Sequence, residues 1–351
     1  MKVLQAYKPG ELRVVDEEKP VPGPREVLAK VYHCGICRTD VSIVEGSLKL
    51  GLDNDPIYPV RIGHEWSGIV EQVGSECQRI KVGDRVISET GIYCGECRPC
   101  MEGAPERCIH GRSLGTIGHC WPGGFAEYIL MPERETYIVP DNVSLEEAAL
   151  VEPASIGFYG LSRASIGPGH NLLVVGTGPI GLGGMACAKG VGTGKIILAG
   201  RKNKKLEIGR KMGADITVNL LHEDLREVIM RETNGYGMDV ILDTTGSVDM
   251  FNKLCYLLHP SGYLVIPAFY ERLVPNADID RLIVTNCTLI GSAGAPNMPG
   301  KILDLISYRH VSLKPMLTDR YPFSHVEEAF RMAGSNNETR IKVMVDFCSE
   351  N

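Results

Sequence analysis

Four cysteines follow one another closely in the sequence, at Cys94, Cys97, Cys100 and Cys108. Four thiolates complete the tetrahedral shell of a Zn²⁺ ion and leave no open position for a substrate. An iron–sulfur cluster is the alternative, because short C-x2-C runs also bind such clusters. The C-x7-C spacing at the end and the lack of a proline after the last cysteine disfavour it. We therefore predict a structural zinc in a lobe of about residues 90–112.

A second set of possible metal ligands is distributed along the chain. Cys37 lies in the motif Gly-Ile-Cys-Arg-Thr-Asp, His64 and Glu65 lie in Gly-His-Glu, and Glu152 lies in Val-Glu-Pro. Each of these residues alone is more often a buried core residue. Together, one thiolate, one imidazole and two carboxylates form the mixed donor set of an open zinc site, which keeps a position for water or substrate.

A glycine-rich turn follows an apolar run and precedes a helical segment. Glycines at such a turn let the backbone approach a pyrophosphate, and the helix N-terminus that follows faces the anion. The motif predicts a dinucleotide-binding site made of Gly176, Gly178, Pro179, Ile180 and Gly181.

The end of the next apolar run indicates which dinucleotide binds. NAD-binding folds usually have an acid about 20 residues after the turn, bound to the ribose 2′-hydroxyl. This chain has Gly200 there, followed by Arg201 and Lys202, with Lys205 one helical turn further. Glycine leaves room for a 2′-phosphate, and Arg201 can bind it with two parallel hydrogen bonds. We predict NADP(H); the alternative is that Arg201 and Lys202 only begin a solvated helix.

The elements that carry these motifs change in kind near residue 157. Before it, short β-rich runs such as residues 67–73 are separated by proline and glycine turns, which is typical of an irregular β-barrel-like domain. After it, apolar runs alternate with helical segments, which predicts a parallel sheet with helices on both faces. Residues 341–347 are expected to form a strand that returns to the first domain, and Ser324 begins a capping box that predicts a helix.

Composition excludes several classes of protein. The chain has 351 residues, of which 44% are hydrophobic and 23% charged. This length and composition predict a soluble enzyme of two domains. A net charge of −6 favours neither nucleic acid nor an anionic membrane as partner. No apolar run is long enough to span a membrane, and no signal core follows Met1, so we expect a cytoplasmic protein. In a reducing compartment, clustered cysteines among the 12 are metal ligands more often than disulfides.

The motifs together resemble the zinc-dependent medium-chain alcohol and polyol dehydrogenases, in particular the branch of sorbitol and threonine dehydrogenases. The resemblance covers nearly the full chain and includes the tail from Val311 to Lys342. It implies a GroES-like β-barrel catalytic domain over residues 1–156 and 292–351. It also implies a Rossmann-type doubly wound domain over residues 157–291, and a homodimer or homotetramer joined near residues 287–292.

The resemblance also assigns roles to single residues. Cys37, His64 and Glu65 would surround the catalytic zinc, with Glu152 as a direct ligand or one acting through water. Asp40 would hydrogen-bond a ligand, and Thr39 would be the hydroxyl that relays the proton. Many members have a histidine three residues after that hydroxyl where this chain has Ser42, so a water held by Glu152 or Glu65 is the expected proton exit. Three further residues would contact the cofactor: Arg38 and Lys342 at the pyrophosphate, and Thr245 beside the nicotinamide.

The expected reaction is hydride transfer between NADP(H) and a secondary alcohol of a polyol, cyclitol or sugar alcohol. Residues 45–58 and 114–122 are expected to line the substrate cleft. Glu45, Asp53 and Asp55 would suit an amino group, which keeps an amino-alcohol or amino-cyclitol substrate open. A zinc-free quinone reductase would share the glycine turn without needing Cys37 or the four cysteines. A zinc-dependent nucleic-acid-binding protein would require a basic surface, which the negative net charge disfavours.

Overall fold

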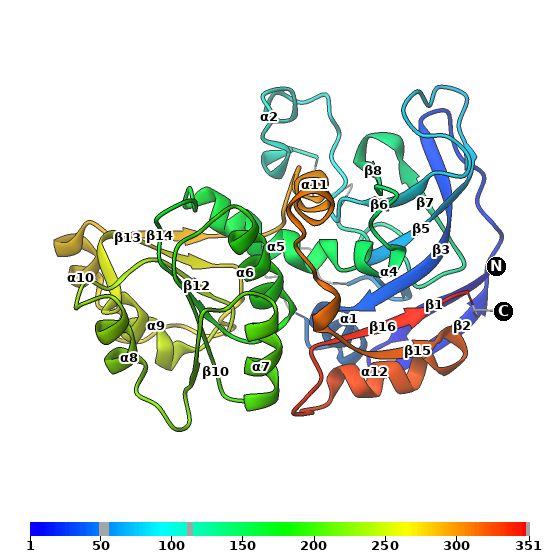
Figure 1. The fold of residues 1–351 in the computed structure, drawn as a ribbon. Helices are drawn as coiled ribbons and strands as arrows, with labels where there is room; N and C mark the ends of the chain where they lie inside the picture. The colour runs from blue at the N-terminus through cyan, green and yellow to red at the C-terminus, as the bar shows by residue number, and fades with distance from the viewer. Residues whose placement is uncertain (49–55, 111–114, 349–351) are drawn as a thin grey trace. The chain divides into compact units, whose positions relative to one another are not determined.

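The computed structural model describes residues 1–48, 56–110 and 115–348. The chain divides into two compact units (Figure 1). The first contains residues 1–152, 299–303 and 317–351, and the second contains residues 153–298 and 304–316. Our prediction from the sequence assigned residues 1–156 and 292–351 to one domain and residues 157–291 to the other. Among the described residues, no helix is long and apolar enough to cross a membrane.

The first unit is built on a seven-stranded sheet. Its order is β15 (Leu317–Pro322), β16 (Lys342–Asp346), β3 (Glu26–Ile36), β5 (Glu65–Val73), β6 (Arg85–Ser88) and β8 (Thr136–Ile138), with β7 (Tyr128–Pro132) also paired to β3. A smaller sheet has the order β2 (Glu11–Asp16), β1 (Lys2–Lys8) and β4 (Val60–Arg61). The predicted returning strand is confirmed, because β16 pairs antiparallel with β3.

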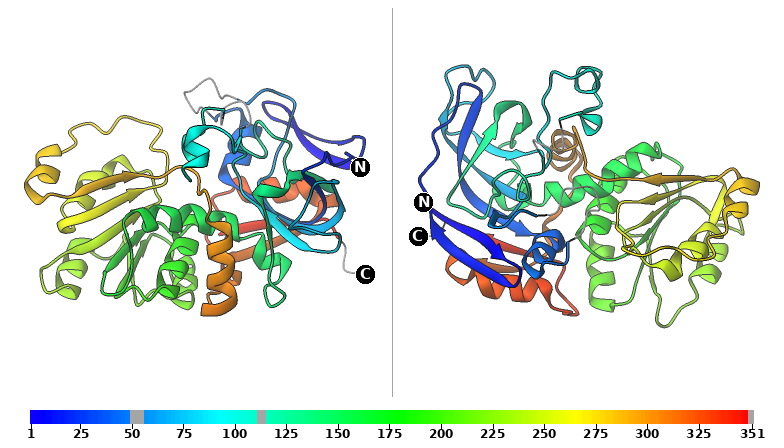
Figure 2. Two further views of the ribbon diagram at one scale, coloured as in Figure 1. Left: turned by 90° about the horizontal axis from the view of Figure 1, so that it is seen from above. Right: turned by 180° about the vertical axis from the view of Figure 1, so that it is seen from behind.

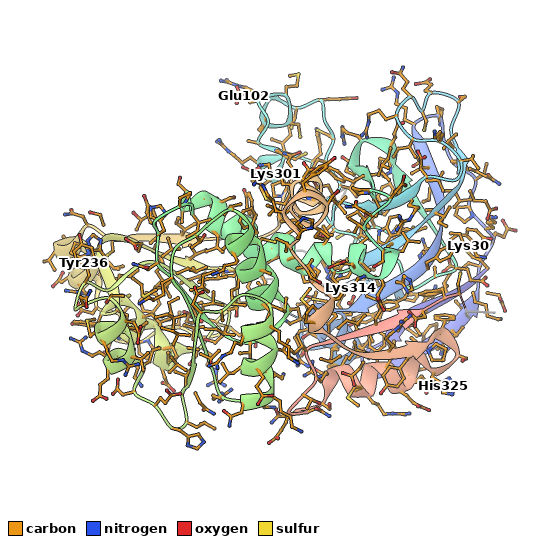
Figure 3. The ribbon with its side chains drawn as sticks, in the orientation of Figure 1. Lys30, Glu102, Tyr236, Lys301, Lys314 and His325 are labelled. Atoms are coloured by element: carbon orange, nitrogen blue, oxygen red, sulfur yellow. The ribbon has the colours of Figure 1, made fainter. Side chains whose placement is uncertain are left out.

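Apolar side chains from both sheets form the core of the first unit. Trp66, Phe125 and Met131 are almost completely buried in it. Burial of such large apolar surfaces is the main stabilising term of a domain of this kind. Lys30 on β3 and His325, both labelled in Figure 3, are exposed at the surface of this unit.

Short helices connect the strands of the first unit. They are α1 (Arg38–Glu45), α2 (Arg98–Met101), α4 (Leu145–Ala148) and α12 (Val326–Gly334), with 3₁₀ turns η1 (Pro105–Arg107), η2 (Glu133–Glu135) and η4 (Phe323–His325). The predicted capping box before α12 is wrong. His325 is the N-cap without a side-chain bond, and the Ser324 hydroxyl contacts the His325 ring instead.

The second unit contains a six-stranded, fully parallel sheet. Its order is β11 (Ile216–Asn219), β10 (Ile196–Gly200), β9 (Leu172–Val175), β12 (Met238–Asp243), β13 (Leu258–Ile266) and β14 (Thr288–Gly291). Helices lie on both faces of the sheet (Figure 2). They are α6 (Pro179–Gly190), α7 (Asn203–Lys211), α8 (Leu225–Glu232), α9 (Val248–Cys255) and α10 (Ile279–Thr285). This is the predicted doubly wound fold.

The remaining elements lie where the chain passes from one unit to the other. They are α5 (Val151–Arg163), α11 (Pro299–Arg309) and η3 (Lys314–Met316). Each unit therefore includes segments that are distant in the sequence.

Candidate active site and metal centres

Three of the four predicted catalytic ligands come together in the first unit. One ligand atom each from Cys37, His64 and Glu65 lies within 4.8 Å of the other two. Cys37 follows β3 and is the N-cap of α1, whereas His64 and Glu65 stand at the start of β5. Because β3 and β5 are paired, residues far apart in sequence reach one point. A thiolate, an imidazole and a carboxylate at this spacing fit an open zinc site.

Two glycines make room for this cluster. A Cβ on Gly35 would lie 2.2 Å from a carboxylate oxygen of Glu65, which is opposite it in the β3–β5 register. Gly63 has φ +98°, and a Cβ there would lie 2.5 Å from the ring of Phe125. A side chain at position 35 would displace the carboxylate of Glu65, and one at position 63, directly before His64, would displace Phe125.

Asp40 fixes two of the ligands. Its carboxylate is fully buried and accepts hydrogen bonds from the backbone N–H of Cys37 at 2.9 Å and of Gly63 at 3.0 Å. The Nδ1 atom of His64 is 3.5 Å from the same carboxylate, which leaves Nε2 to face a metal. Burial alone would lower the pKa of His64, but the negative charges of Asp40 and Cys37 outweigh it and raise that pKa well above its ordinary value.

Lys342 has a different environment from the one predicted. Its ammonium lies 2.5 and 2.6 Å from the two carboxylate oxygens of Glu65 and donates to the backbone oxygen of Ile36 at 3.1 Å. Its side chain is 3% exposed, and that of Glu65 is 1% exposed. We expected Lys342 to face the cofactor pyrophosphate. Instead, all three donors of its ammonium group are directed at Glu65 and Ile36.

Glu152 lies near the cluster of Cys37, His64 and Glu65 but is not one of its members within the described chain. Its Oε1 atom accepts a hydrogen bond from the hydroxyl of Thr90 at 3.0 Å. Burial raises its pKa, and the charge of Glu65 adds to this effect, whereas His64 opposes it. Sequence reasoning missed Thr90, which has no motif of its own.

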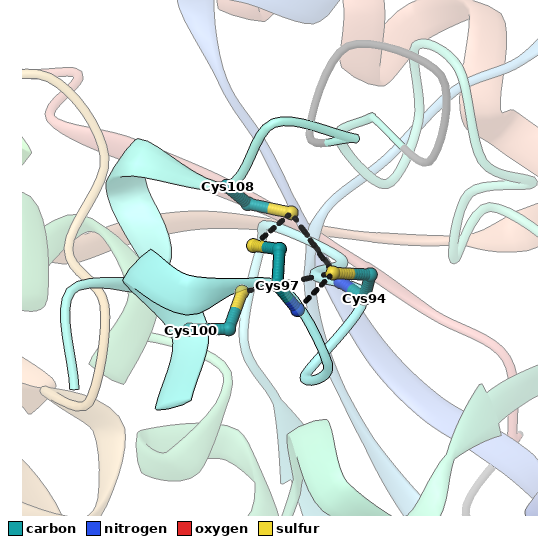
Figure 4. A group of neighbouring side chains, drawn as sticks. All are labelled: Cys94, Cys97, Cys100 and Cys108. Atoms are coloured by element: carbon teal, nitrogen blue, oxygen red, sulfur yellow. Dashed lines mark hydrogen bonds between the residues drawn. The ribbon is translucent and has the colours of Figure 1, made fainter. Parts of the chain in front are cut away.

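The four cysteines of the lobe form a second cluster (Figure 4). The sulfur of Cys94 is 3.5 Å from that of Cys108 and 3.9 Å from that of Cys100, and the sulfurs of Cys97 and Cys108 are 4.0 Å apart. With Zn–S bonds of about 2.3 Å, the edges of a ZnS₄ tetrahedron are about 3.8 Å long. The cluster therefore has the dimensions of a closed zinc shell.

Backbone hydrogen bonds and burial also change the pKa values of these thiols. The N–H group of Cys97 points at the sulfur of Cys94 at 3.3 Å. Hydrogen bonding from the backbone of Cys100 lowers the pKa of Cys97 to about 6, whereas burial raises the pKa of Cys100 to about 12. At neutral pH the metal-free cluster is thus part thiolate and part thiol.

The glycine turn of the second unit joins β9 to α6. Gly178 is the N-cap of α6 and Pro179 is its first residue, followed by Ile180. Gly176 has φ +113°, and a Cβ on Gly181 would lie 2.4 Å from the Gly176 carbonyl oxygen. A Cβ on Gly178 would meet nothing within 4 Å, so a ligand can approach the backbone at that point.

Comparison with known proteins decides the family. The model of the alcohol dehydrogenase GroES-like domain matches residues 23–141, and that of the zinc-binding dehydrogenase matches residues 179–307. The chain belongs to the zinc-type medium-chain alcohol dehydrogenases. It is therefore an alcohol dehydrogenase by family.

Individual members of this family are similar over almost the full chain. D-arabitol-phosphate dehydrogenase of Enterococcus avium is 32% identical, with 99% of this chain and 97% of that protein covered. Sorbitol dehydrogenase of Bacillus subtilis is 31% identical, with coverage of 98% and 97%.

Two solved structures share the fold. An alcohol dehydrogenase of Escherichia coli complexed with NADH has a TM-score of 0.90 at 28% identity, with 99% of both chains covered. A zinc-binding dehydrogenase of Sinorhizobium meliloti bound to NADP has a TM-score of 0.88 at 26% identity, with 98% of both chains covered.

The residues predicted to choose the cofactor in this dehydrogenase lie at the end of β10. Gly200 is its last residue, Arg201 is exposed, and Lys202 and Lys205 are half-buried at the start of α7. A Cβ on Gly200 would lie only 2.6 Å from the Cγ2 atom of Thr177. A side chain at position 200 would therefore require Thr177, the second residue of the glycine turn, to shift, which the sequence alone does not indicate.

Three further residues predicted from the family resemblance, Thr245, Thr39 and Arg38, have the following contacts. Thr245 follows β12, and both its N–H and its hydroxyl donate to Asp243, at 2.9 and 2.6 Å. The Oγ1 atom of Thr39 is 3.7 Å from the sulfur of Cys37. Arg38 is exposed and forms an ion pair with Glu45 at 2.9 Å. Asp53 and Asp55 lie outside the described residues, as do parts of both predicted cleft segments.

Proposed function

We propose that this protein is a zinc-dependent, NADP(H)-preferring dehydrogenase that interconverts a secondary alcohol of a polyol and its ketone. The observation that carries the proposal is the cluster of Cys37, His64 and Glu65, whose ligand atoms lie within 4.8 Å of each other. A zinc ion bound there supplies a Lewis acid that lowers the pKa of the substrate hydroxyl, and the nicotinamide accepts the hydride.

The surrounding residues orient the ligands and carry the proton. Asp40 accepts a hydrogen bond from the backbone N–H of Cys37, and its carboxylate lies 3.5 Å from the Nδ1 atom of His64. These contacts hold both ligands in place. We assign the hydroxyl of Thr39 as the first proton acceptor, which its 3.7 Å separation from the Cys37 sulfur supports. The carboxylate oxygens of Glu65 are bound by the ammonium of Lys342. We therefore assign Glu152, which accepts a hydrogen bond from Thr90, as the carboxylate that binds the water through which the proton leaves.

The preference for NADP(H) rests on the end of β10. Gly200 offers no carboxylate to the adenosine ribose, and the exposed Arg201 is free to bind a 2′-phosphate with its planar guanidinium. Solved relatives bind NADP or NADH, so the family alone does not decide between them. Gly176, Gly178 and Gly181 are assigned to the pyrophosphate in either case.

A polyol or its phosphate ester is the substrate class that we propose. Its support is the similarity to D-arabitol-phosphate and sorbitol dehydrogenases. The amino-alcohol alternative has less support, because Glu45 pairs with Arg38. We further propose a homo-oligomer joined through β14, an edge strand of the second unit's sheet. We also propose two zinc ions per chain, one in each cluster.

A substrate panel tests the proposed reaction. Sorbitol, arabitol, cyclitols, their phosphates and amino alcohols are offered with NADP⁺ and NAD⁺, and the reduced nicotinamide is followed by absorbance. Oxidation of at least one polyol or polyol phosphate, lost in Cys37→Ser, supports the proposal. Activity confined to quinones, or kept in full by Cys37→Ser, contradicts it.

A further inference from the structure

A buried carboxylate joins two loops of the second unit. Asp243, the last residue of β12, is fully buried. Its Oδ1 atom accepts hydrogen bonds from the N–H and the hydroxyl of Thr245 at 2.9 and 2.6 Å, and its Oδ2 atom accepts one from the hydroxyl of Tyr270 at 2.6 Å. All three donors are uncharged. A buried carboxylate is unfavourable unless hydrogen bonds satisfy it, so the position of Asp243 depends on donors from both loops.

The loop that follows β12 packs against the glycine turn. The N–H and the hydroxyl of Thr244 donate to the carbonyl of Val175 at 2.9 and 3.0 Å. A Cβ on Gly176 would lie 2.3 Å from the Oγ1 atom of Thr244 and 3.3 Å from the Cγ2 atom of Thr245. Because the hydroxyl of Thr245 donates to Asp243, its methyl group is the part that faces the turn.

The second loop follows β13 and contributes Tyr270. The ring of Tyr270 packs edge-to-face on Phe251 of α9, with ring centroids 6.3 Å apart. A Cβ on Gly246 would lie 2.3 Å from the carbonyl oxygen of Phe269, so the two loops are in direct contact. Burial raises the pKa of Tyr270, and the hydrogen bond to Asp243 and its negative charge raise it further. Tyr270 therefore keeps its proton at neutral pH and remains the donor.

The order of the strands relates these loops to the dinucleotide. The sheet order β11-β10-β9-β12-β13-β14 reverses between β9 and β12, and such folds bind a dinucleotide at that point, across the carboxyl ends of the strands. Each half of the sheet receives one mononucleotide. Gly200 ends β10, where such folds bind the adenosine ribose. Asp243 and Tyr270 follow the strands of the other half, and we therefore expect them beside the nicotinamide mononucleotide.

We propose that Asp243 and Tyr270 are positioning residues for the nicotinamide half of the cofactor. Their hydrogen bond holds the loops after β12 and β13 together as one side of the binding site, and Asp243 also fixes Thr245 against the glycine turn. The proposal rests on the proposed function only in its nicotinamide cofactor. Binding measurements therefore test it without turnover.

Cofactor binding to two matched tyrosine variants tests the proposal. Tyr270→Phe removes the hydroxyl that donates to Asp243. Tyr256→Phe is the control, because the hydroxyl of Tyr256 also donates to an aspartate, Asp278, but at the exposed surface of the same unit. NADPH and NADH are titrated by the fluorescence of the nicotinamide. Adenosine 2′,5′-bisphosphate and ADP, which lack the nicotinamide half, are titrated by calorimetry, and thermal unfolding shows whether each variant is folded.

Tyr270→Phe should weaken binding of the dinucleotide alone. We expect its Kd to rise about tenfold, because a hydrogen bond to a buried charged group is lost, whereas the Kd values of the two adenosine nucleotides stay unchanged. The emission of bound NADPH should also move toward that of the free cofactor, because the nicotinamide is held less firmly. Asp243→Asn turns one acceptor into a donor that faces another donor, so it should raise the Kd further. Tyr256→Phe should match the wild type in every titration.

Three outcomes separate the positioning role from its alternatives. Equal Kd values for the dinucleotide in Tyr270→Phe and Tyr256→Phe overturn the proposal and leave the proposed function standing if polyols are oxidised. Equal weakening of the dinucleotide and of the adenosine nucleotides also overturns it, because the hydroxyl would then only stabilise the fold. The expected pattern in a protein that oxidises no polyol would keep the positioning role and refute the proposed function.

Discussion

The ammonium of Lys342 and the carboxylate of Glu65 form an ion pair, with Nζ to Oε distances of 2.5 and 2.6 Å, and both side chains are buried. The residues are brought together by three neighbouring strands, β16, β3 and β5. Burial of two charges is unfavourable unless their hydrogen bonds are satisfied, and the carbonyl of Ile36 accepts the third one here. A possible metal ligand thus has its own fixed countercharge.

Removal of that countercharge should strongly destabilise the first unit. Lys342→Met leaves the carboxylate of Glu65 buried without its partner, which costs roughly 3–5 kcal/mol. Lys2→Met is the control, because Lys2 pairs with Asp16 at the surface with exposures of 57% and 75%, and such a loss costs at most about 1 kcal/mol. Urea unfolding measures both. Equal costs in the two variants would show that the buried pair contributes no more than an exposed one.

The zinc affinity of the four-cysteine lobe should fall on acidification. Zinc binds thiolates, so Cys100, whose pKa is raised to about 12, must lose its proton on binding at neutral pH. Cys97, whose pKa is lowered to about 6, is already ionised there and takes up a proton only below that pH. A chelator that competes for the lobe zinc measures this affinity from pH 8 to pH 5, in the Cys37→Ser variant so that the other proposed zinc site does not contribute. The zinc affinity should fall over the whole range, and more steeply below pH about 6. Affinity independent of pH would contradict these proton counts.

Cofactor preference should depend on Arg201 and on Thr177. Arg201→Leu should lower kcat/KM for NADP⁺ about ten- to a hundredfold and leave that for NAD⁺ nearly unchanged, because a charge-assisted hydrogen bond is lost. Lys204→Leu, at an exposed lysine three residues on, is the control. A wild type that uses NAD⁺ equally well would show that Arg201 does not bind the phosphate.

Creation of an NAD⁺ enzyme should require a change at the glycine turn as well. An aspartate at position 200 would repel the 2′-phosphate, but its Cβ would meet Thr177 at 2.6 Å. We expect Gly200→Asp with Arg201→Leu to bind both cofactors poorly. Addition of Thr177→Ser, which removes the Cγ2 atom, should restore NAD⁺ use. Steady-state kinetics with both cofactors would reject this packing argument if the additional change had no effect.

The second unit should carry the contact between subunits. β14 is an edge strand of its sheet. Leu289 on this strand is 46% exposed, and Ile283 and Val284 on the preceding helix α10 are 65% and 73% exposed. Such edges and patches pair readily with a second copy. Light scattering at micromolar concentration should detect a dimer or tetramer, and Leu289→Lys should shift it toward monomer. Leu221→Lys, at an exposed leucine elsewhere on the unit, should not. A monomeric wild type would contradict the prediction.

Local sequence patterns predicted those parts of the structure that depend on neighbours in the chain. The parallel sheet followed from alternating strands and helices, and the four cysteines lie close together in sequence. The Lys342–Glu65 pair could not be predicted in this way, because it spans 277 residues and depends on the register of three strands. The close approach of Thr177 to Gly200 likewise depends on how β9 and β10 pair. The N-cap of α12 differed because a 3₁₀ turn precedes that helix.

Zinc content measured together with turnover tests the central assignment most directly. By mass spectrometry, the wild type should hold about two zinc ions per chain, and Cys37→Ser and Cys100→Ser should each hold about one. Cys37→Ser should keep its melting temperature and its NADPH binding but lose about a thousandfold in kcat, since a Lewis acid contributes several kcal/mol. Cys100→Ser should mainly lose stability, because structural zinc contributes to folding. A Cys37→Ser enzyme with two zinc ions and undiminished polyol oxidation would contradict the catalytic site proposed here.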